Sequence, residues 1–407
     1  MQNEFLSTAL GMQGFIVVAI KTEPQHIELE LDREEAAYVC SRCGQIHLAY
    51  YDRYQIRPQD LPISGRRVYL RLWKYRVYCS CCHKAVSEHL PYLRPHAQLT
   101  KRFEKALHDE CKEAPVKAVA ERHRLAWGTV RDVDVRFLKE KISRQSLDGL
   151  RWIGIDEIAH EKRHKYLTVI TDLQRRKVVR VLNERKAQSL ASFFKELGKE
   201  GCAKIECVVI DMWRPYRRAI RRCLKNALTV IDKFHVIKKA HEALDQVRKD
   251  EQKQLPPEQQ RGLKGKRWLL LQSLQTTAKK ERVPSLLDLM ALNDKLAKAY
   301  LLKEEFREWY GTKPAVKENS TAFLARVKKE LNKWRRHVHQ SKLLPFKKVL
   351  RTIRNWRGPI LNYFLTGLSN GLSEGINNVI KTIKKRAYGY RNKEYFTLKI
   401  YQKVGLI

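Results

Sequence analysis

The chain has 407 residues, and its 82 Lys and Arg residues against 44 Asp and Glu residues give a formal net charge of +38. A surface this basic repels itself unless a polyanion is bound, so nucleic acid is the expected partner. The longest apolar run, residues 14–20, is too short to cross a bilayer, and the N-terminus lacks the basic start of a signal peptide, which favours a cytoplasmic protein over a membrane or secreted one.

Residues 1–95 predict a small β-rich module that holds one zinc ion. Two Cys-x2-Cys pairs supply four thiolates at the spacing of a tetrahedral zinc site. The predicted ligands are Cys40, Cys43, Cys79 and Cys82. Cys81 competes with Cys82 for the fourth position, His47 and His83 are weaker substitutes, and the alternative without zinc is a set of reduced cysteines. A four-cysteine site is closed, so we expect a structural zinc with no catalytic role.

Residues 96–146 have the apolar periodicity of helices, and the last two helices resemble a helix-turn-helix DNA-binding domain. The second of these would enter a major groove, with Thr129 and Arg131 near its start as candidate DNA contacts. Arg124 occupies the turn, where glycine is usual. The alternative is an ordinary three-helix packing unit.

Two buried strand patterns within residues 150–237 each end on an aspartate. Asp156 closes the apolar run 152–155, and Asp211 closes the run 205–210. Either aspartate alone is commonly a turn or helix-capping residue. Side by side at the rim of one sheet, however, the two carboxylates would repel each other unless a divalent cation neutralised them. The pair therefore suggests metal-assisted attack on a phosphodiester.

The order of elements in this region is three strands, a helix, a strand, a helix and a strand, as in an RNase H-like fold. The predicted segments are 152–158, 166–172, 177–182, 189–197, 205–212, 215–225 and 228–231. In that fold the first and fourth strands of the mixed sheet are neighbours, which brings Asp156 and Asp211 together. Residues 238–360 then predict only Lys- and Arg-rich helices, which we interpret as a long α-helical insertion.

The last part of the core, residues 361–407, contains an amphipathic helix over residues 370–387. Its polar face carries one acid near the start, Glu374, followed by Lys381 and Lys385, which could meet phosphates. This face turns away from the core, so only a position at the rim of the sheet would let Glu374 reach a metal ion. The alternative is an acid that is stabilised only by the helix dipole.

Basic and aromatic residues beside these acids are further candidate DNA contacts. Those that follow the second aspartate are Trp213, Arg217, Arg218 and Arg221. Near the C-terminus, Tyr388, Tyr390 and Arg391 could stack on a flipped or frayed base. The alternatives are a solvated basic face for the arginines and a cap on the sheet for the tyrosines.

Together these segments resemble the DDE transposases of bacterial insertion sequences, of the insertion-sequence L-three type (the ISL-three family). The matching stretches are the paired-cysteine N-terminus and residues 154–158, 209–216, 232–235, 369–378 and 386–390. The resemblance implies an α+β multidomain protein whose RNase H-like catalytic core is interrupted by the helical insertion. It also implies that Asp156, Asp211 and Glu374 bind two Mg²⁺ or Mn²⁺ ions, with Asp232 as a minority candidate.

The activity that the resemblance implies is binding to the element's terminal inverted repeats, followed by metal-dependent cleavage and transfer of DNA strands. Its implied partners are double-stranded DNA of the element ends and the target, and a homodimer or higher oligomer in synapsis, at the nucleoid. Two alternatives stay open: a zinc-ribbon and helix-turn-helix DNA-binding regulator, and a structure-specific nuclease on the same fold. A peripheral membrane protein is disfavoured because the basic residues are spread along the chain.

Overall fold

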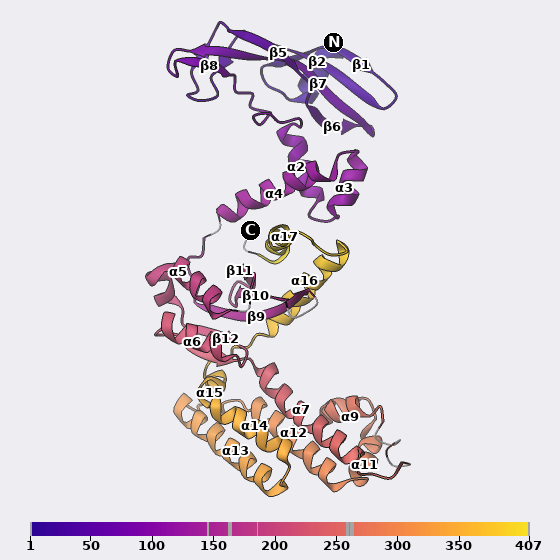
Figure 1. Ribbon diagram of the computed structural model, residues 1–407, viewed down its shortest axis with the longest axis vertical. Helices are drawn as coiled ribbons and strands as arrows, with labels where there is room; N and C mark the ends of the chain where they lie inside the picture. Colours follow the sequence, from indigo (N-terminus) through magenta and orange to yellow (C-terminus); the bar gives the residue numbers. More distant parts are fainter. Residues whose placement is uncertain are drawn as a thin grey trace. The chain divides into compact units, whose positions relative to one another are not determined.

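The computed structural model describes residues 2–144, 146–161, 165–184, 186–257, 260 and 264–405, and the chain forms two compact units. Unit 1 comprises Met1–Arg144 and Arg386–Gln402, and unit 2 comprises Gln145–Lys385 and Lys403–Ile407. Figure 1 shows the elements coloured along the sequence. Each unit contains helices and a sheet with both parallel and antiparallel strand pairs, so the architecture is mixed α/β.

Unit 1 begins with a sheet whose central strand is β7, Arg66–Cys79. The strand order is β1-β2-β7-β5, and β6 and β8 also pair with β7. The other elements are α1 (Gln2–Leu10), β1 (Phe15–Thr22), β2 (His26–Arg33), β3 (Tyr38–Val39), β4 (Ile46–His47), β5 (Asp52–Ile56), β6 (Gln59–Ile63) and β8 (Lys84–Ser87). This part of the chain is rich in β-structure, as the sequence analysis expected.

The long strand β7 buries one face in its first half and the opposite face in its second half. In the first half the buried residues are Val68, Leu70 and Leu72. In the second half they are Tyr75, Val77 and Cys79. Because successive side chains point to opposite faces, the change from even to odd positions moves the apolar core to the other side of the strand. The second core contains cysteines that were predicted to bind zinc.

Four further helices pack in unit 1: three form the helix-turn-helix region, and the last comes from near the C-terminus. They are α2 (Lys101–Glu110), α3 (Val116–His123), α4 (Trp127–Ser143) and α17 (Lys393–Val404). Between α3 and α4, Arg124 has φ 52°, the left-handed conformation in which glycine is favoured. The turn therefore has the usual backbone although its residue is unusual.

A buried charged network attaches α17 to the helix-turn-helix region. Asp134 of α4 is fully buried, and Tyr395 OH donates a 2.6 Å hydrogen bond to its Oδ2 atom. Lys399 Nζ lies 3.2 Å from the same oxygen. A buried carboxylate is tolerated only with such partners, which ties α17 to α4. The sequence analysis assigned residues 361–407 as a whole to the core, whereas the structure groups Arg386–Gln402 with unit 1.

Unit 2 contains a five-stranded mixed sheet in the order β11-β10-β9-β12-β13. Its strands are β9 (Trp152–Glu161), β10 (Lys165–Asp172), β11 (Lys177–Leu182), β12 (Cys207–Ile210) and β13 (Leu228–Ile231). Strand β10 is antiparallel to β9 and β11, whereas β12 is parallel to β9 and β13. The sequence analysis predicted these strands, and the pairing of β9 with β12 confirms that the first and fourth are neighbours.

The two faces of this sheet are covered by different parts of the chain. The helices near the sheet include α5 (Ala187–Lys204), α6 (Arg214–Cys223) and α16 (Gly371–Arg386). Ile153 and Ile155 share an apolar cluster with α5 and α6. Between them Gly154 points to the other face, where an added Cβ would lie 2.2 Å from Asn370 Oδ1. The glycine thus makes room for the segment that leads into α16.

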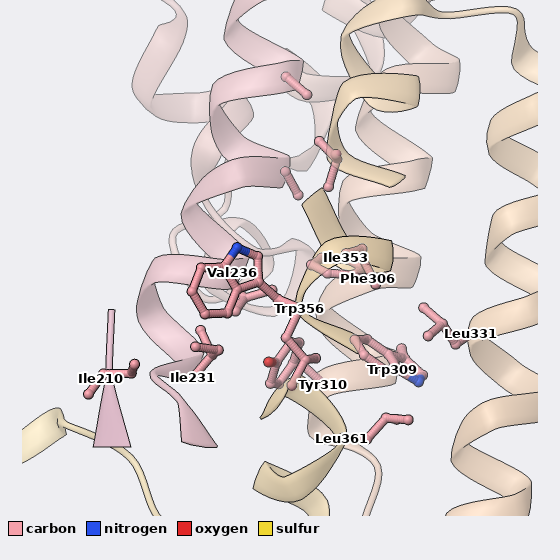
Figure 2. Close-up of a cluster of buried hydrophobic side chains, with 14 of the residues drawn as sticks. Ile210, Ile231, Val236, Phe306, Trp309, Tyr310, Leu331, Ile353, Trp356 and Leu361 are labelled. Carbon is pink, nitrogen blue, oxygen red and sulfur yellow. The ribbon is translucent and has the colours of Figure 1, made fainter. Parts of the chain in front are cut away.

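From α7 to α15 the described residues contain helices and no strand, as predicted for this region. These helices are α7 (Lys233–Gln252), α9 (Arg267–Leu271), α10 (Leu274–Lys279), α11 (Val283–Ala291), α12 (Asp294–Gly311), α13 (Ser320–Ser341), α14 (Leu344–Asn355) and α15 (Arg357–Thr366). Figure 2 shows the apolar cluster running from Ile210 and Ile231 of the sheet to Phe306 and Trp309 of α12. One core therefore joins sheet and helices. Crossing a membrane would require a longer or more apolar helix than any in the described part of the chain.

Candidate active site

An acidic cluster lies at the end of the sheet where β9 and β12 run side by side. Asp156 is in β9, Asp211 follows β12, and His235 is in the first turn of α7. One ligand atom from each of the three lies within 4.8 Å of the others. Because Val209 is opposite Gly154 in the parallel pair, the residues two places further along both strands reach the same end of the sheet. The structure therefore brings Asp156 and Asp211 together, as expected from the sequence.

His235 belongs to this cluster, although the sequence analysis gave it no role. Its Nε2 atom lies 3.0 Å from Asp211 Oδ1. Burial lowers the pKa of His235, but the nearby carboxylates, above all that of Asp211, outweigh this effect and raise the pKa above its usual value. The imidazole pairs with Asp211, and this contact favours the protonated form of His235. The available sequence signal was a histidine in the first helical turn after a strand.

The surroundings of Asp156 disfavour its charged form. Burial raises the pKa of Asp156, and the negative charge of Asp211 raises it further. The backbone N–H of Glu157 and the amide of Asn377 act in the opposite direction without cancelling the shift. A divalent cation between such carboxylates would remove the repulsion, so the arrangement favours cation binding.

Two asparagines attach the start of α16 to the ends of the strands. Asn377 Nδ2 donates a 2.8 Å hydrogen bond to Asp156 Oδ2. Asn370 Nδ2 donates a 3.1 Å hydrogen bond to the carbonyl oxygen of Ile155, and its backbone N–H donates one of 2.9 Å to Asp232 Oδ1. Asp232 thus holds the C-terminal segment, and within the described ranges it is outside the group of close ligand atoms. Neither asparagine was predicted from the sequence, because an uncharged amide does not stand out in a pattern of charged residues.

Glu374 lies on the exposed side of α16. It precedes Asn377 by three residues, so the two side chains share one side of the helix. Since Asn377 contacts Asp156, α16 does pass the rim of the sheet, as a third ligand would require. Among the described residues Glu374 is not in the group of ligand atoms within 4.8 Å, and its role as third ligand stays a prediction.

The oxygen atoms at this site suit a hard divalent cation. Carboxylate, amide and water oxygens are the ligands that Mg²⁺ and Mn²⁺ prefer. Asn377, which contacts Asp156, has a buried Oδ1 atom, and Ser373 one helical turn earlier has a buried Oγ atom; no hydrogen-bond partner for either atom lies within the described ranges. A bound cation with its water shell would satisfy such acceptors.

The four predicted cysteines form a second metal-type cluster, in unit 1. The Sγ atoms of Cys40, Cys43, Cys79 and Cys82 lie within 4.8 Å of one another. The Sγ atoms of Cys43 and Cys79 are 3.4 Å apart, and those of Cys40 and Cys82 are 4.0 Å apart. Cys81 is exposed and lies outside this cluster. Four converging thiols are the donor set of a structural zinc site.

The candidate DNA contacts of unit 2 divide into exposed residues and residues used in packing. Arg218 and Arg221 of α6 and Lys381 and Lys385 of α16 are exposed. Trp213 is half-buried beside Asp211 in the sequence. Arg217 differs, because it donates a 3.2 Å hydrogen bond to Asn355 O and stacks over Trp356 with 5.1 Å to the ring centroid. This arginine joins α6 to the end of α14, which the sequence could not indicate.

In the helix-turn-helix region, Thr129 is exposed at the start of α4. Arg131 pairs with Asp132 and stacks over Trp127, with 5.1 Å to the ring centroid. Trp127 is 49% exposed at the first position of the helix, where a base or sugar could contact it. Sequence reasoning did not select Trp127, although an exposed aromatic at the start of a recognition helix is informative.

The aromatic candidates near the C-terminus have different environments. Tyr388 is fully exposed with φ 52°, and Arg391 is exposed. The ring of Tyr390 packs against Phe396 of α17 at a centroid distance of 4.9 Å, and burial raises the pKa of Tyr390 to about 12. Tyr388 is therefore available to a partner, whereas Tyr390 mainly supports α17.

Three family models match the chain in the same order as these features. A zinc-finger of transposase IS204/IS1001/IS1096/IS1165 matches residues 37–82, and a helix-turn-helix domain of transposase family ISL3 matches residues 88–138. A model described as Transposase matches residues 153–400. The zinc ribbon, the helix-turn-helix and the domain with the acidic cluster together define a DNA-binding transposase.

Curated relatives agree with these matches over nearly the whole chain. The transposase for insertion sequence element IS1001 of Bordetella parapertussis is 30% identical over 397 residues, 96% of this chain and 95% of that protein. The transposase for insertion sequence element IS1557 of Mycobacterium tuberculosis (strain CDC 1551 / Oshkosh) is 28% identical over 382 residues, 87% of this chain and 83% of that protein. The chain belongs to the ISL3 family of DDE transposases.

Proposed function

We propose that this transposase binds the terminal inverted repeats of its insertion sequence and catalyses metal-dependent cleavage and transfer of DNA strands. The observation that carries the proposal is the meeting of Asp156 and Asp211 at one end of the sheet, within 4.8 Å. Glu374 is the proposed third acid, because its helix reaches the same rim through Asn377. The bound Mg²⁺ or Mn²⁺ ions would supply Lewis-acid stabilisation and an activated oxygen nucleophile.

The residues around the acids have separable roles in this proposal. Asn377 donates to Oδ2 of Asp156 and the backbone N–H of Glu157 donates to Oδ1, while His235 pairs with Oδ1 of Asp211. A carboxylate oxygen that accepts one hydrogen bond still has a lone pair for a cation. Asn370 and Asp232 keep the start of α16 against the sheet, and thereby keep Glu374 near the rim. His235 and Asn377 are positioning residues, since they act through the two aspartates.

We further propose that the catalytic domain is an RNase H-like core with a helical insertion. The strand order β11-β10-β9-β12-β13, with three antiparallel strands followed by parallel pairing, supports the core. The run of helices between β13 and α16 supports the insertion at residues 238–360. The domain boundaries 1–95, 96–146, 150–237, 238–360 and 361–407 remain part of this proposal, with the final helix grouped with unit 1.

The proposed partners follow from the activity. Thr129, Arg131, Arg218 and Arg221, with Lys381 and Lys385, would contact the DNA of the element ends. Joining two ends requires a homodimer or a higher oligomer, and the proposed location is the cytoplasm, at the nucleoid. The basic balance of the chain, +38, supports a polyanionic partner.

The test is cleavage and joining of a labelled duplex that carries the element's own ends, with magnesium or manganese. Wild type is expected to cut and join, whereas Asp156→Ala, Asp211→Ala and Glu374→Ala are expected to bind the duplex in a gel shift and do neither. If Glu374→Ala stays active, the third ligand is another residue, with Asp232 next in line. Cutting without joining would indicate a structure-specific nuclease, and binding without cutting would indicate a DNA-binding regulator.

A further inference from the structure

The hairpin of α13 and α14 has a charge composition unlike the helix packed against it. The hairpin, residues 320–355, contains eleven Lys and Arg residues and one acid, Glu330. In contrast, α12 contains four cationic and four acidic residues within Asp294–Gly311. On α12 these charges pair, as in Lys298 with Asp294 at 2.6 Å and Arg307 with Glu304 at 3.5 Å. The hairpin has too few acidic residues to pair with its cations in this way.

Both hairpin helices present rows of cations on their solvent side. On α13 the apolar stripe consists of buried residues Phe323, Val327, Leu331, Trp334 and Val338. Opposite this stripe, at the helical spacing i, i+4, i+7, are the exposed residues Lys329, Lys333 and Arg336. On α14 the same spacing places Lys347, Arg351 and Arg354 on the exposed side. Each row extends about 10 Å along its helix.

These six cations have no ion-pair partner anywhere in the described part of the chain. The one acid of the hairpin, Glu330, is already engaged by Thr312 and Arg326. Like charges one helical turn apart destabilise a helix unless anions lie between them. An anionic partner would therefore stabilise both rows.

The hairpin offers charge without aromatic stacking surfaces. Its aromatic residues Phe323, Trp334 and Phe346, and Trp356 directly after it, are all buried in the core. Unpaired bases stack on exposed aromatic rings, whereas the phosphates of a duplex are contacted by Lys, Arg and polar groups and need no aromatic ring. The composition thus fits the phosphates of double-stranded DNA rather than a single strand.

We propose that the α13–α14 hairpin is a sequence-independent docking surface for the phosphate backbone of duplex DNA. This inference rests on the proposed function only in its choice of DNA as the biological polyanion. The surface acts in addition to the helix-turn-helix, which reads sequence, and it holds DNA through counterion release. A second copy of the chain is a poorer occupant, because its own net charge of +38 would repel the rows.

The experiment uses the full-length protein and a random-sequence duplex, with affinity measured over a series of salt concentrations. The hairpin variant replaces all six row residues with glutamine: Lys329, Lys333, Arg336, Lys347, Arg351 and Arg354. Each lost phosphate contact should reduce the slope of log K against log salt by about 0.9. We expect the slope to fall by about 3–5 and the affinity at about 0.15 M salt to fall at least tenfold.

A matched control changes net charge without touching the rows. It replaces Lys295, Lys298 and Arg307 of α12 with glutamine, residues whose charges are already paired. A three-residue variant of the α13 row, Lys329, Lys333 and Arg336, provides the equal change in charge. The α13 variant should lower the slope and the control should not. Thermal unfolding of all variants checks that the fold is kept.

Two results would overturn the inference. One is an unchanged slope for the six-residue variant that keeps its thermal stability. The other is an unchanged slope together with loss of self-association in sedimentation, which would make the hairpin a protein interface. Binding to random DNA is measured without catalysis. A wild type that never cuts DNA would therefore contradict the proposed function, but the salt dependence of binding would still test the hairpin.

Discussion

The cysteine cluster and the aspartate cluster both bring together groups that need a cation, but they are held in place differently. At the cysteine site four thiols converge on one another, with Sγ–Sγ distances of 3.4 and 4.0 Å, and a neutral amide, Gln45, is 3.6 Å from Cys79 Sγ. At the aspartate site each carboxylate has a protein partner, Asn377 for Asp156 and His235 for Asp211. The cysteine cluster therefore supports a structural zinc in unit 1, whereas at the acidic site hydrogen bonds and ion pairs of the protein itself hold the two carboxylates.

The largest expected effect is the loss of a zinc ligand. Cys40→Ser should abolish zinc binding and unfold the zinc end of β7, because metal binding supplies on the order of 10 kcal/mol to small zinc domains. Cys81→Ser is the matched control, since Cys81 is exposed and outside the cluster. Zinc content and circular dichroism of both variants are the measurements. Zinc loss in Cys81→Ser but not in Cys82→Ser would show that the fourth ligand is assigned incorrectly.

The second effect tests how closely α16 must approach the sheet. Gly154→Ala would place a Cβ 2.2 Å from Asn370 Oδ1, so either the helix start moves or the strand does. Overpacking of this kind costs about 1–3 kcal/mol of unfolding free energy. We expect lower thermal stability and lost strand cleavage. Gly358→Ala is the control, because an added Cβ there meets no atom within 4 Å. Equal stability of the two variants would contradict the close approach.

The difference between the sites also explains what the sequence could and could not predict. Cys-x2-Cys spacing is local, so it predicted the four cysteines whose Sγ atoms converge. The strands of unit 2 and the aspartates that follow their apolar runs were visible because such runs are also local, although β9 continues beyond Asp156 to Glu161. Asn370 and Asn377 were missed because their roles depend on contacts with residues more than a hundred positions away. Arg217 was a candidate DNA contact, but its guanidinium stacks over Trp356, and only the contact of α6 with the end of α14 determines that.

The third prediction concerns His235, which holds Asp211. His235→Ala is expected to reduce cleavage about 10–100-fold, as for other groups that orient a metal ligand. Because the residue acts through Asp211, the magnesium concentration for half-maximal cleavage should rise while binding of the element ends is unchanged. The neighbouring Phe234→Ala is the control, since Phe234 is 62% exposed. An unchanged magnesium requirement would remove His235 from the site.

The smallest expected effect is a change in stability at the aspartate site, and its sign is opposite to that of the change expected at the cysteine site. Whereas loss of a cysteine should destabilise unit 1, Asp156→Asn should stabilise unit 2 in the absence of divalent metal, by about 0.5–2 kcal/mol, while abolishing cleavage. The reason is that burial and the charge of Asp211 raise the pKa of Asp156, so folding disfavours its ionised form. In the wild type, the stability from this carboxyl is fully present below its unfolded pKa, close to 3.8, and is lost as pH rises through the raised folded pKa.

The advantage of Asp156→Asn over wild type should therefore grow as pH rises through that window and stay constant above it. Magnesium should reverse the order, because a bound cation stabilises the wild-type carboxylates and not the amide. Thermal unfolding at several pH values, with a chelator and with magnesium, measures both effects, and Asp148→Asn serves as an exposed control. If Asp156→Asn is less stable than wild type without metal at every pH, the acidic site depends on its carboxylates for folding, and the contrast with the zinc site fails.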